Sequence, residues 1–196
     1  MKKIIIFISI FIAVIVLKPS GIYASDLKID DFSDIQIQAY SHNKNITKEF
    51  KHALLEKGED QAIQDLMDKY DTFTAEMKIL KEDETSNNIK TYVAKNIEIK
   101  TYKAFRWIER VYGQYSVNVD KQVITSARNP YVTIESDNGI GLSSSMLSRY
   151  YKINSSKTGV SFVVNYDLMT VNSIATGYGY IGKFQGVAQG GVLSVK

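Results

Sequence analysis

The sequence contains no cysteine and only two histidines, and both shortages restrict the chemistry open to the protein. Without cysteine there is no disulfide framework, no thiol nucleophile and no thiolate metal ligand. His42 and His52 both lie in the first third of the chain, and no Ser-His-Asp arrangement can be distinguished around them. The sequence therefore predicts no metal and no cofactor.

A long apolar run is present only at the start of the chain. Two lysines are followed by the run from Ile4 to Leu17, in which only Ser9 is polar. This layout predicts a secretory signal peptide over residues 1–24, cleaved after Ala24. An uncleaved anchor is the alternative, but a helix over this run reaches only about 21 Å, and a bilayer core is about 30 Å thick. We expect a secreted protein, extracellular or associated with the cell envelope.

The expected mature chain has no excess of charge of either sign. Without the predicted signal peptide it contains 21 basic and 21 acidic residues. A basic nucleic-acid binder is therefore not expected. The charges are unevenly spread: residues 25–90 carry a balance of −6 and residues 91–196 a balance of +6. The two halves can attract each other within one molecule or between copies, or the asymmetry is that of a solvated surface. Lysine outnumbers arginine 20 to 4, which with the signal peptide suggests a Gram-positive bacterium.

The apolar periodicity of the expected mature chain changes from helical to alternating near Thr72. Helical spacing predicts helices over 45–57 and 60–70. Alternation then predicts strands over 72–80, 89–100, 102–112, 114–119, 123–127, 131–136, 160–166, 170–176 and 180–195. Segment 26–40 fits an edge strand or a leader, and segment 143–154 fits a loop or a strand. Asn138-Gly139 predicts a tight hairpin.

This order of elements predicts an α+β fold, with two short N-terminal helices followed by an antiparallel β-sheet or small β-sandwich. The expected organisation is a signal peptide (1–24), an acidic helix-rich segment (25–88) and a β-rich domain (89–196). Residues 117–126 and 164–173 share the pattern V-N-x-D with a later serine. Each predicts a strand, a turn and a strand, either as a duplication or as two independent hairpins.

Three short signatures occur in the order known from penicillin-recognising serine enzymes: S-x-x-K at 41–44, S-D-N at 136–138 and K-T-G at 157–159. That chemistry needs the serine and the lysine one helical turn apart, and "SHNKN" is a poor helix start. The last two signatures also stand too close together for a helical subdomain to lie between Asn138 and Lys157. We therefore expect these matches to follow from composition and from a hairpin turn.

Two other matches are equally isolated. "GYGYIG", residues 177–182, fits G-x-G-x-x-G, but a dinucleotide site needs a helix directly afterwards, and Gly186, Gly190 and Gly191 follow instead. A bent or bulged strand is expected there. Glu49 and His52 have the spacing of di-iron helical bundles, but no second copy exists, so ion pairing on an exposed helix face is expected.

The stretch "KTYKAFRWIERVYGQY" combines basic and aromatic side chains. In a strand, Arg106, Ile108, Arg110 and Tyr112 share one face, and Phe105, Trp107, Glu109 and Val111 share the other. This strand has two possible roles. Either its aromatic face lies against the core and its basic face is solvated, or the strand forms a partner surface, since Arg and Tyr are favoured at interfaces. The candidate binding residues are Tyr102, Arg106, Trp107, Arg110 and Tyr112. A cell-wall polymer, glycan or protein would be the partner.

The C-terminal third combines polar alternating strands with a glycine-rich end. In this texture it resembles the terminal β-domain of small secreted proteins of unknown function in Gram-positive bacteria, and the resemblance implies export. We expect a secreted, non-enzymatic protein that binds a cell-envelope or extracellular partner. Two alternatives are a secreted hydrolase with unidentified catalytic residues and a membrane-acting effector or immunity factor.

Overall fold

The computed structural model describes residues 35–84, 88–102, 105–136, 141–174 and 177–192 of the chain. These ranges belong to one compact unit, residues 31–196. The elements are β1 (Ile35–Ser41), β2 (Lys44–Asn45), α1 (Thr47–Lys57), α2 (Glu59–Lys69), β3 (Thr74–Glu84), β4 (Ile89–Tyr102), β5 (Phe105–Asn118), β6 (Val123–Ser136), β7 (Gly141–Ile153), β8 (Val160–Ile174) and β9 (Gly177–Val192). The predicted signal peptide lies outside the described ranges. No helix within them is long and apolar enough to cross a membrane.

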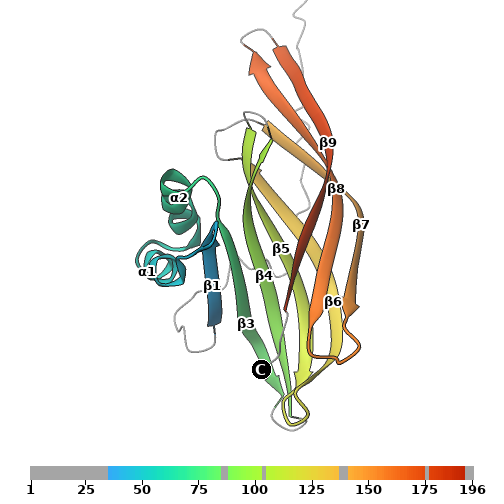
Figure 1. Ribbon diagram of the computed structural model, residues 1–196. Coiled ribbons are helices and arrows are strands. Elements are labelled where there is room, and N and C mark those ends of the chain that lie inside the picture. The colour runs from blue at the N-terminus through green and yellow to red at the C-terminus, as the bar shows by residue number, and fades with distance from the viewer. Residues whose placement is uncertain (1–34, 85–87, 103–104, 137–140, 175–176, 193–196) are drawn as a thin grey trace, which may run out of the picture. The chain divides into compact units, whose positions relative to one another are not determined.

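The strands form two antiparallel sheets (Figure 1). The first has the order β2-β1-β3-β4-β5-β6 and curls into a half-barrel, and the second has the order β7-β8-β9. The expected boundary at 88/89 lies between β3 and β4, which pair with each other in the first sheet. The expected mainly antiparallel β structure with two helices is confirmed.

The two helices lie side by side on one flank of the first sheet (Figure 1). They are joined at Gly58, whose φ of 77° is accessible to glycine at little cost, so one residue ends α1 and begins α2. The Oδ1 atom of Asn45 accepts a hydrogen bond from the Thr47 backbone N–H at the start of α1. Both predicted helices are confirmed, within two residues at each end.

Their predicted place at the start of the fold is wrong, because β1 precedes them. Ile35, Ile37 and Ala39 of β1 are buried, the intervening residues are exposed, and Ile37 pairs with Met77 of β3. The helix pair is therefore an insertion between two adjacent strands. Such a short alternation gives only a weak signal in the sequence, and it becomes a strand because the edge of β3 offers backbone partners.

Apolar side chains fill two layers, one on each face of the first sheet. The layer beneath the helices contains Phe50, Ile63 and Leu66, all nearly inaccessible, and the ring of Phe50 packs edge-on against Phe73 at 5.1 Å. The layer between the sheets is one cluster, made up of Ala94, Trp107, Val111, Tyr115, Val117, Ile124, Ala127, Val160, Phe162, Val164, Tyr166, Leu168 and Ala188. Strict alternation along β8 supplies every second residue from Val160 to Leu168.

Gly113 lies at a close approach of the two sheets. It lies in β5, and a methyl group added to it would overlap the ring of Phe162 on β8. Gly190 of β9 makes a second close approach, since a Cβ atom there would lie 2.5 Å from Oδ1 of Asn96. Glycine at these positions lets the sheets pack at short range.

Several predicted strands are joined into longer ones. β5 covers both 102–112 and 114–119 apart from residues at the ends, and β6 runs through 123–136. The Asn129-Pro130 pair that separates the predicted segments of β6 sits at a register shift between Arg128 and Tyr131. An end strand tolerates proline at such an irregularity. Residues 143–154, ambiguous in the sequence, belong to β7 as far as Ile153.

The two V-N-x-D stretches adopt different structures. Residues 117–126 form the expected hairpin between β5 and β6, with a turn at 119–122. The hairpin predicted over 164–173 is wrong, because Asp167 lies inside the continuous strand β8. β8 pairs with β7 on one side and β9 on the other, and this pairing outweighs the local turn tendency of the aspartate. The predicted Asn138-Gly139 turn lies outside the described residues.

Candidate functional site

The residues singled out for binding lie on two paired strands: Tyr102 ends β4, and Arg106, Trp107, Arg110 and Tyr112 follow along β5. Trp107, Arg110 and Tyr112 are each at most 6% exposed. Arg106 is half-buried and donates from Nη1 to the carbonyl oxygen of Met67 in α2, at 3.0 Å. The side chain of Tyr102 lies outside the described ones.

The expected division of this strand into two faces is confirmed by its partners. Arg106 and Arg110 contact α2, whereas Trp107 and Val111 belong to the cluster between the sheets. The basic face is not solvated as expected, because α2 lies over it. A partner would reach Trp107, Arg110 and Tyr112 only if the helices or the second sheet moved away, so binding at these residues stays a prediction.

Beneath the start of α2, two buried cations meet three carboxylates. Arg110 contacts Glu59 from Nε at 3.1 Å, Asp60 from Nη2 at 3.0 Å and Glu135 from Nη1 at 2.6 Å. Glu59 also accepts a hydrogen bond from Nζ of Lys95, and Lys95 and Arg110 are each 3% exposed. The basic half and the acidic half of the sequence therefore attract each other within one molecule at this point.

Two features of the surroundings of Lys95 have opposite effects on its pKa. Burial lowers the pKa of Lys95, while the carboxylate of Glu59 acts in the opposite direction. The Lys95 ammonium lies 5.3 Å from the ring centre of Tyr112, which stacks on Tyr131 at 4.4 Å. This arrangement fixes α2 to the sheet, and Glu59 is the group that both buried cations share.

The opposite face of β5 holds one buried acid, Glu109, which is 1% exposed. Its Oε2 atom accepts a hydrogen bond from the hydroxyl of Tyr166 at 2.5 Å, and its Oε1 atom lies 3.2 Å from Nζ of Lys100. Burial raises the pKa of the Glu109 carboxyl, and the contacts with Tyr166 and Lys100 only partly offset this. Glu109 thus joins the sheets through β8 and is the acid of the inter-sheet layer.

We expect the stability of Glu109→Gln, relative to the wild type, to rise as the pH increases from about 4 to 8. The pKa of Glu109 is higher in the folded protein than in the unfolded chain. The protonated Glu109 carboxyl therefore contributes its full stabilisation below the unfolded pKa, about 4.3. This contribution is lost as the pH rises through the folded-state pKa and the carboxyl ionises. Glutamine keeps the acceptor for Tyr166 and removes this loss. Urea unfolding from about pH 4 to 8 should show the variant gaining stability over the wild type as pH rises. Glu56→Gln, at an exposed position, serves as control, and an unchanged pH profile for Glu109→Gln would contradict the assignment.

Within the described residues, the serine-enzyme signatures do not place a serine and a lysine one helical turn apart. Ser41 ends β1 and Lys44 lies in β2, so they occupy a hairpin and not successive turns of a helix. Lys157 has a φ of 57° in the turn between β7 and β8, where Oδ1 of Asn154 accepts hydrogen bonds from the backbone of Thr158 and Gly159. Asp137 and Asn138 lie outside the described residues.

The other two matches also have structural explanations. Residues 177–182 form the first part of β9, with a register shift opposite Thr170 and Val171, as expected for a bulged strand. The carboxylate of Glu49 accepts hydrogen bonds from Nζ of Lys69 at 2.5 Å and from the hydroxyl of Tyr70 at 2.8 Å. His52 pairs with Glu56 at 3.2 Å on an exposed helix face. Among the described residues, no group of three or more potential ligands is arranged to hold a metal ion.

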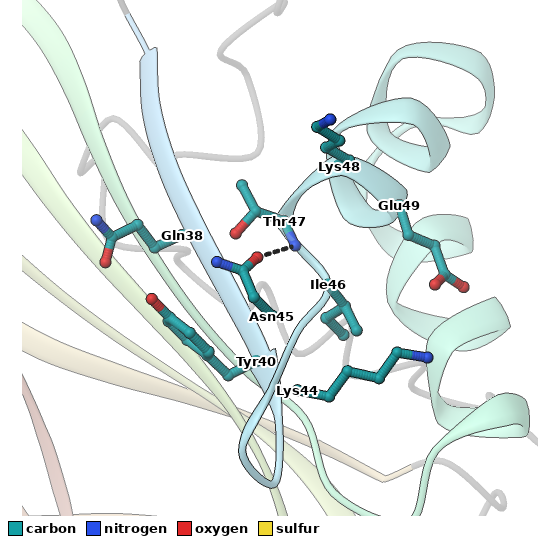
Figure 2. Close-up of a pocket in the computed structure, with 8 residues that line it drawn as sticks. All are labelled: Gln38, Tyr40, Lys44, Asn45, Ile46, Thr47, Lys48 and Glu49. Atoms are coloured by element: carbon teal, nitrogen blue, oxygen red, sulfur yellow. Dashed lines mark hydrogen bonds between the residues drawn. The ribbon is translucent and has the colours of Figure 1, made fainter.

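A hollow of about 580 Å³, open to solvent, lies where β1, β2 and α1 meet (Figure 2). It is lined by Gln38, Tyr40, Lys44, Asn45, Ile46, Thr47, Lys48 and Glu49. Figure 2 shows Gln38 and Tyr40 on one side of the segment that joins β2 to α1, and Lys44 and Glu49 on the other. The polar groups do not converge on one point, and Asn45 and Glu49 are engaged in bonds within the protein. The hollow is therefore a weak candidate for a ligand site.

A stronger candidate is the strand β7, at the end of the second sheet (Figure 1). Four of its large apolar or aromatic side chains are about half exposed: Met146 51%, Leu147 52%, Tyr150 54% and Tyr151 46%. Arg149 and Lys152 stand among them and are exposed as well. These six residues are called the β7 surface below. Within the described part of the chain, no hydrogen bond or ion pair engages the side chains of Arg149, Tyr150, Tyr151 or Lys152.

Sequence reasoning passed over the β7 surface, since its serine cluster argued for a loop. One signal was available: no acidic residue occurs between Asp137 and Asp167, while Arg149, Lys152 and Lys157 do. The predicted binding strand β5 and the β7 surface share the combination of tyrosine with basic residues. They differ in exposure, which depends on the neighbours that the fold supplies.

Comparison with known proteins gives no match: no family model, no curated protein and no solved structure is significantly similar to this chain.

Proposed function

We propose that the protein is secreted and non-enzymatic and binds a cell-envelope or extracellular partner through the β7 surface. The supporting observation is the exposure of Met146, Leu147, Tyr150 and Tyr151 together on one end strand, beside two cations that no described carboxylate pairs with. Clustered exposed apolar side chains mark interaction sites on soluble domains. Tyr, Met and Arg are also the residue types enriched at the centres of such sites.

The charge of the surface selects the kind of partner. Residues 138–166 carry three basic side chains and no acidic one, although the predicted mature chain is neutral. A local positive field attracts anionic partners and raises their rate of encounter. Export, as the apolar start of the chain predicts, would bring this surface to the anionic polymers and exposed proteins of a bacterial envelope.

The proposal is tested by sedimentation with isolated bacterial cell walls. The full-length gene is expressed in a secreting Gram-positive host, and the protein is purified from the medium and mixed with walls at low and at physiological salt. We expect pelleting to persist at physiological salt and the apparent affinity of Tyr150→Thr/Tyr151→Thr to fall at least tenfold. Threonine keeps the tendency to form a strand, so this variant should stay folded.

Lys48→Ser/Leu55→Ser, which changes a cation and an exposed apolar residue on α1, is the matched control and should pellet like the wild type. Failure of the wild type to pellet, or equal pelleting of the β7 variant, would contradict the proposal.

A further inference from the structure

Among the described strands, the backbone of β7 is hydrogen-bonded to a neighbouring strand on one side only, and β6, the end strand of the first sheet, lies near β7 without pairing with it. β7 is the end strand of its sheet and pairs with β8, and no strand pairing joins its other edge to another described strand. Its register with β8 shifts between Met146 and Ser148 and is then regular from Ser148 to Ile153. This stretch without a register shift presents a regular edge of backbone groups, which is the template that an added strand requires.

The exposed side chains stand on both faces of this edge. Tyr151 pairs with Phe162 and Arg149 with Val164, so both point toward the face of the sheet that carries the core. Tyr150 pairs with Val163 and Lys152 with Ser161, so they point to the opposite face. A flat surface contacts only one of these faces. A strand lying beside β7 contacts both, because its own side chains alternate in the same way.

Insertion of the same edge into a lipid bilayer would also contact both faces, but at a high energetic cost. Backbone N–H and C=O groups without partners cost several kcal/mol each in the hydrocarbon region. An added strand satisfies those groups instead. The geometry therefore favours a polypeptide over a membrane as the occupant of the edge.

The charges of the edge distinguish between possible strands. A second copy of β7 would bring Arg149 and Lys152 close to their own counterparts, and like charges on paired strands are destabilising. A basic end strand with a bulge at Leu147 is thus protected against pairing with itself. A strand carrying carboxylates is not repelled and gains opposite-charge contacts.

We infer that β7 takes up an extended acidic peptide segment of another protein, which pairs with Ser148–Ile153 as a fourth strand of the second sheet. Its acidic residues meet Arg149 and Lys152, and its apolar residues cover Tyr150 and Tyr151. The inference rests on the proposed function and names the class of partner: an acidic polypeptide, not a wall polymer or a lipid.

The test uses three short labelled peptides of equal length and the full secreted protein. The first carries Glu residues three positions apart with Val and Thr between them, so that one Glu can face Arg149 and the next can face Lys152 on the opposite face. The second has the same sequence with alternate backbone nitrogens methylated along one edge, and the third replaces Glu by Lys. Fluorescence anisotropy should show binding of the first peptide, at least tenfold weaker binding of the second and none of the third. Arg149→Ser/Lys152→Ser should weaken the first at least tenfold, while Lys48→Ser/Leu55→Ser leaves it unchanged.

Several results would overturn the inference. Equal binding of the methylated peptide would show attraction by charge without strand pairing. A dimer of the protein alone in analytical ultracentrifugation, abolished by Tyr150→Thr/Tyr151→Thr, would assign the edge to a second copy. Undiminished pelleting with protease-treated walls, or binding to phosphatidylglycerol vesicles in place of the peptide, would identify a polymer or a lipid instead. Pelleting with protease-treated walls leaves the proposed function standing, whereas loss of all wall binding removes it.

Discussion

A Glu59→Gln variant should lose about 3 kcal/mol of unfolding free energy, the cost of removing one partner from a buried ion pair. Glu59 is the carboxylate shared by Lys95 and Arg110, both 3% exposed. Glutamine has nearly the same shape but no charge, so it leaves both cations less well compensated. Without Glu59, burial acts on Lys95 with less opposition, and the pKa of Lys95 falls further below its ordinary value.

The loss is measured by urea unfolding, followed by circular dichroism and by the fluorescence of Trp107, the only tryptophan. Glu56→Gln is the matched control: its 3.2 Å contact with His52 is solvent-exposed, and such pairs contribute at most about 1 kcal/mol. Adding Lys95→Met to Glu59→Gln should restore part of the stability, because it removes one uncompensated charge. A loss below about 1 kcal/mol for Glu59→Gln would contradict the role given to this network.

A Gly113→Ala variant should lose about 3 kcal/mol, the upper part of the usual range for overpacking a dense core. The added methyl group would overlap the ring of Phe162, which is 1% exposed and sits in the layer between the sheets. Either the ring leaves its rotamer or the two sheets move apart, and both disturb neighbours that are packed equally tightly.

Phe162→Leu tests this explanation in a double-mutant cycle. Alone it should destabilise the protein, since it removes buried ring atoms. Combined with Gly113→Ala it should cost clearly less than the sum of the two single changes, because the smaller side chain leaves room for the methyl group. Additive effects would show that Gly113 is required for another reason.

Local regularities were readable in the sequence. The helical spacing of apolar residues predicts the helices, and strict alternation predicts the two faces of β5. Both depend on residues close along the chain, where the geometry of a helix or a strand fixes the relation between side chains. Segment 26–40 fits either an edge strand or a leader, and the turn predicted in the middle of β8 is wrong, because the structure of both segments is decided by the strands beside them.

The accessibility of the candidate site also depends on residues that are distant in the sequence. Tyrosine and basic residues are combined in the predicted binding stretch, 102–115, and again at 149–152, and the sequence does not show which of the two stretches is more accessible. The fold places α2 over one face of the first and the second sheet over the other, and leaves the second on an end strand. Burial is set by residues distant in sequence: Arg110 is covered by Glu59, 51 positions earlier.

The sequence alone determines the absence of cysteine chemistry, the apolar start that predicts export, the neutral charge of the expected mature chain and the periods of its helices and strands. These are properties of composition and of neighbouring residues. Only the tertiary structure decides that the basic strand β5 lies inside its sheet, between β4 and β6, and that the basic strand β7 lies at the end of its sheet. That difference arises because a sheet has two ends, and the order of strands in space, which is not local in the sequence, decides which strand stands there.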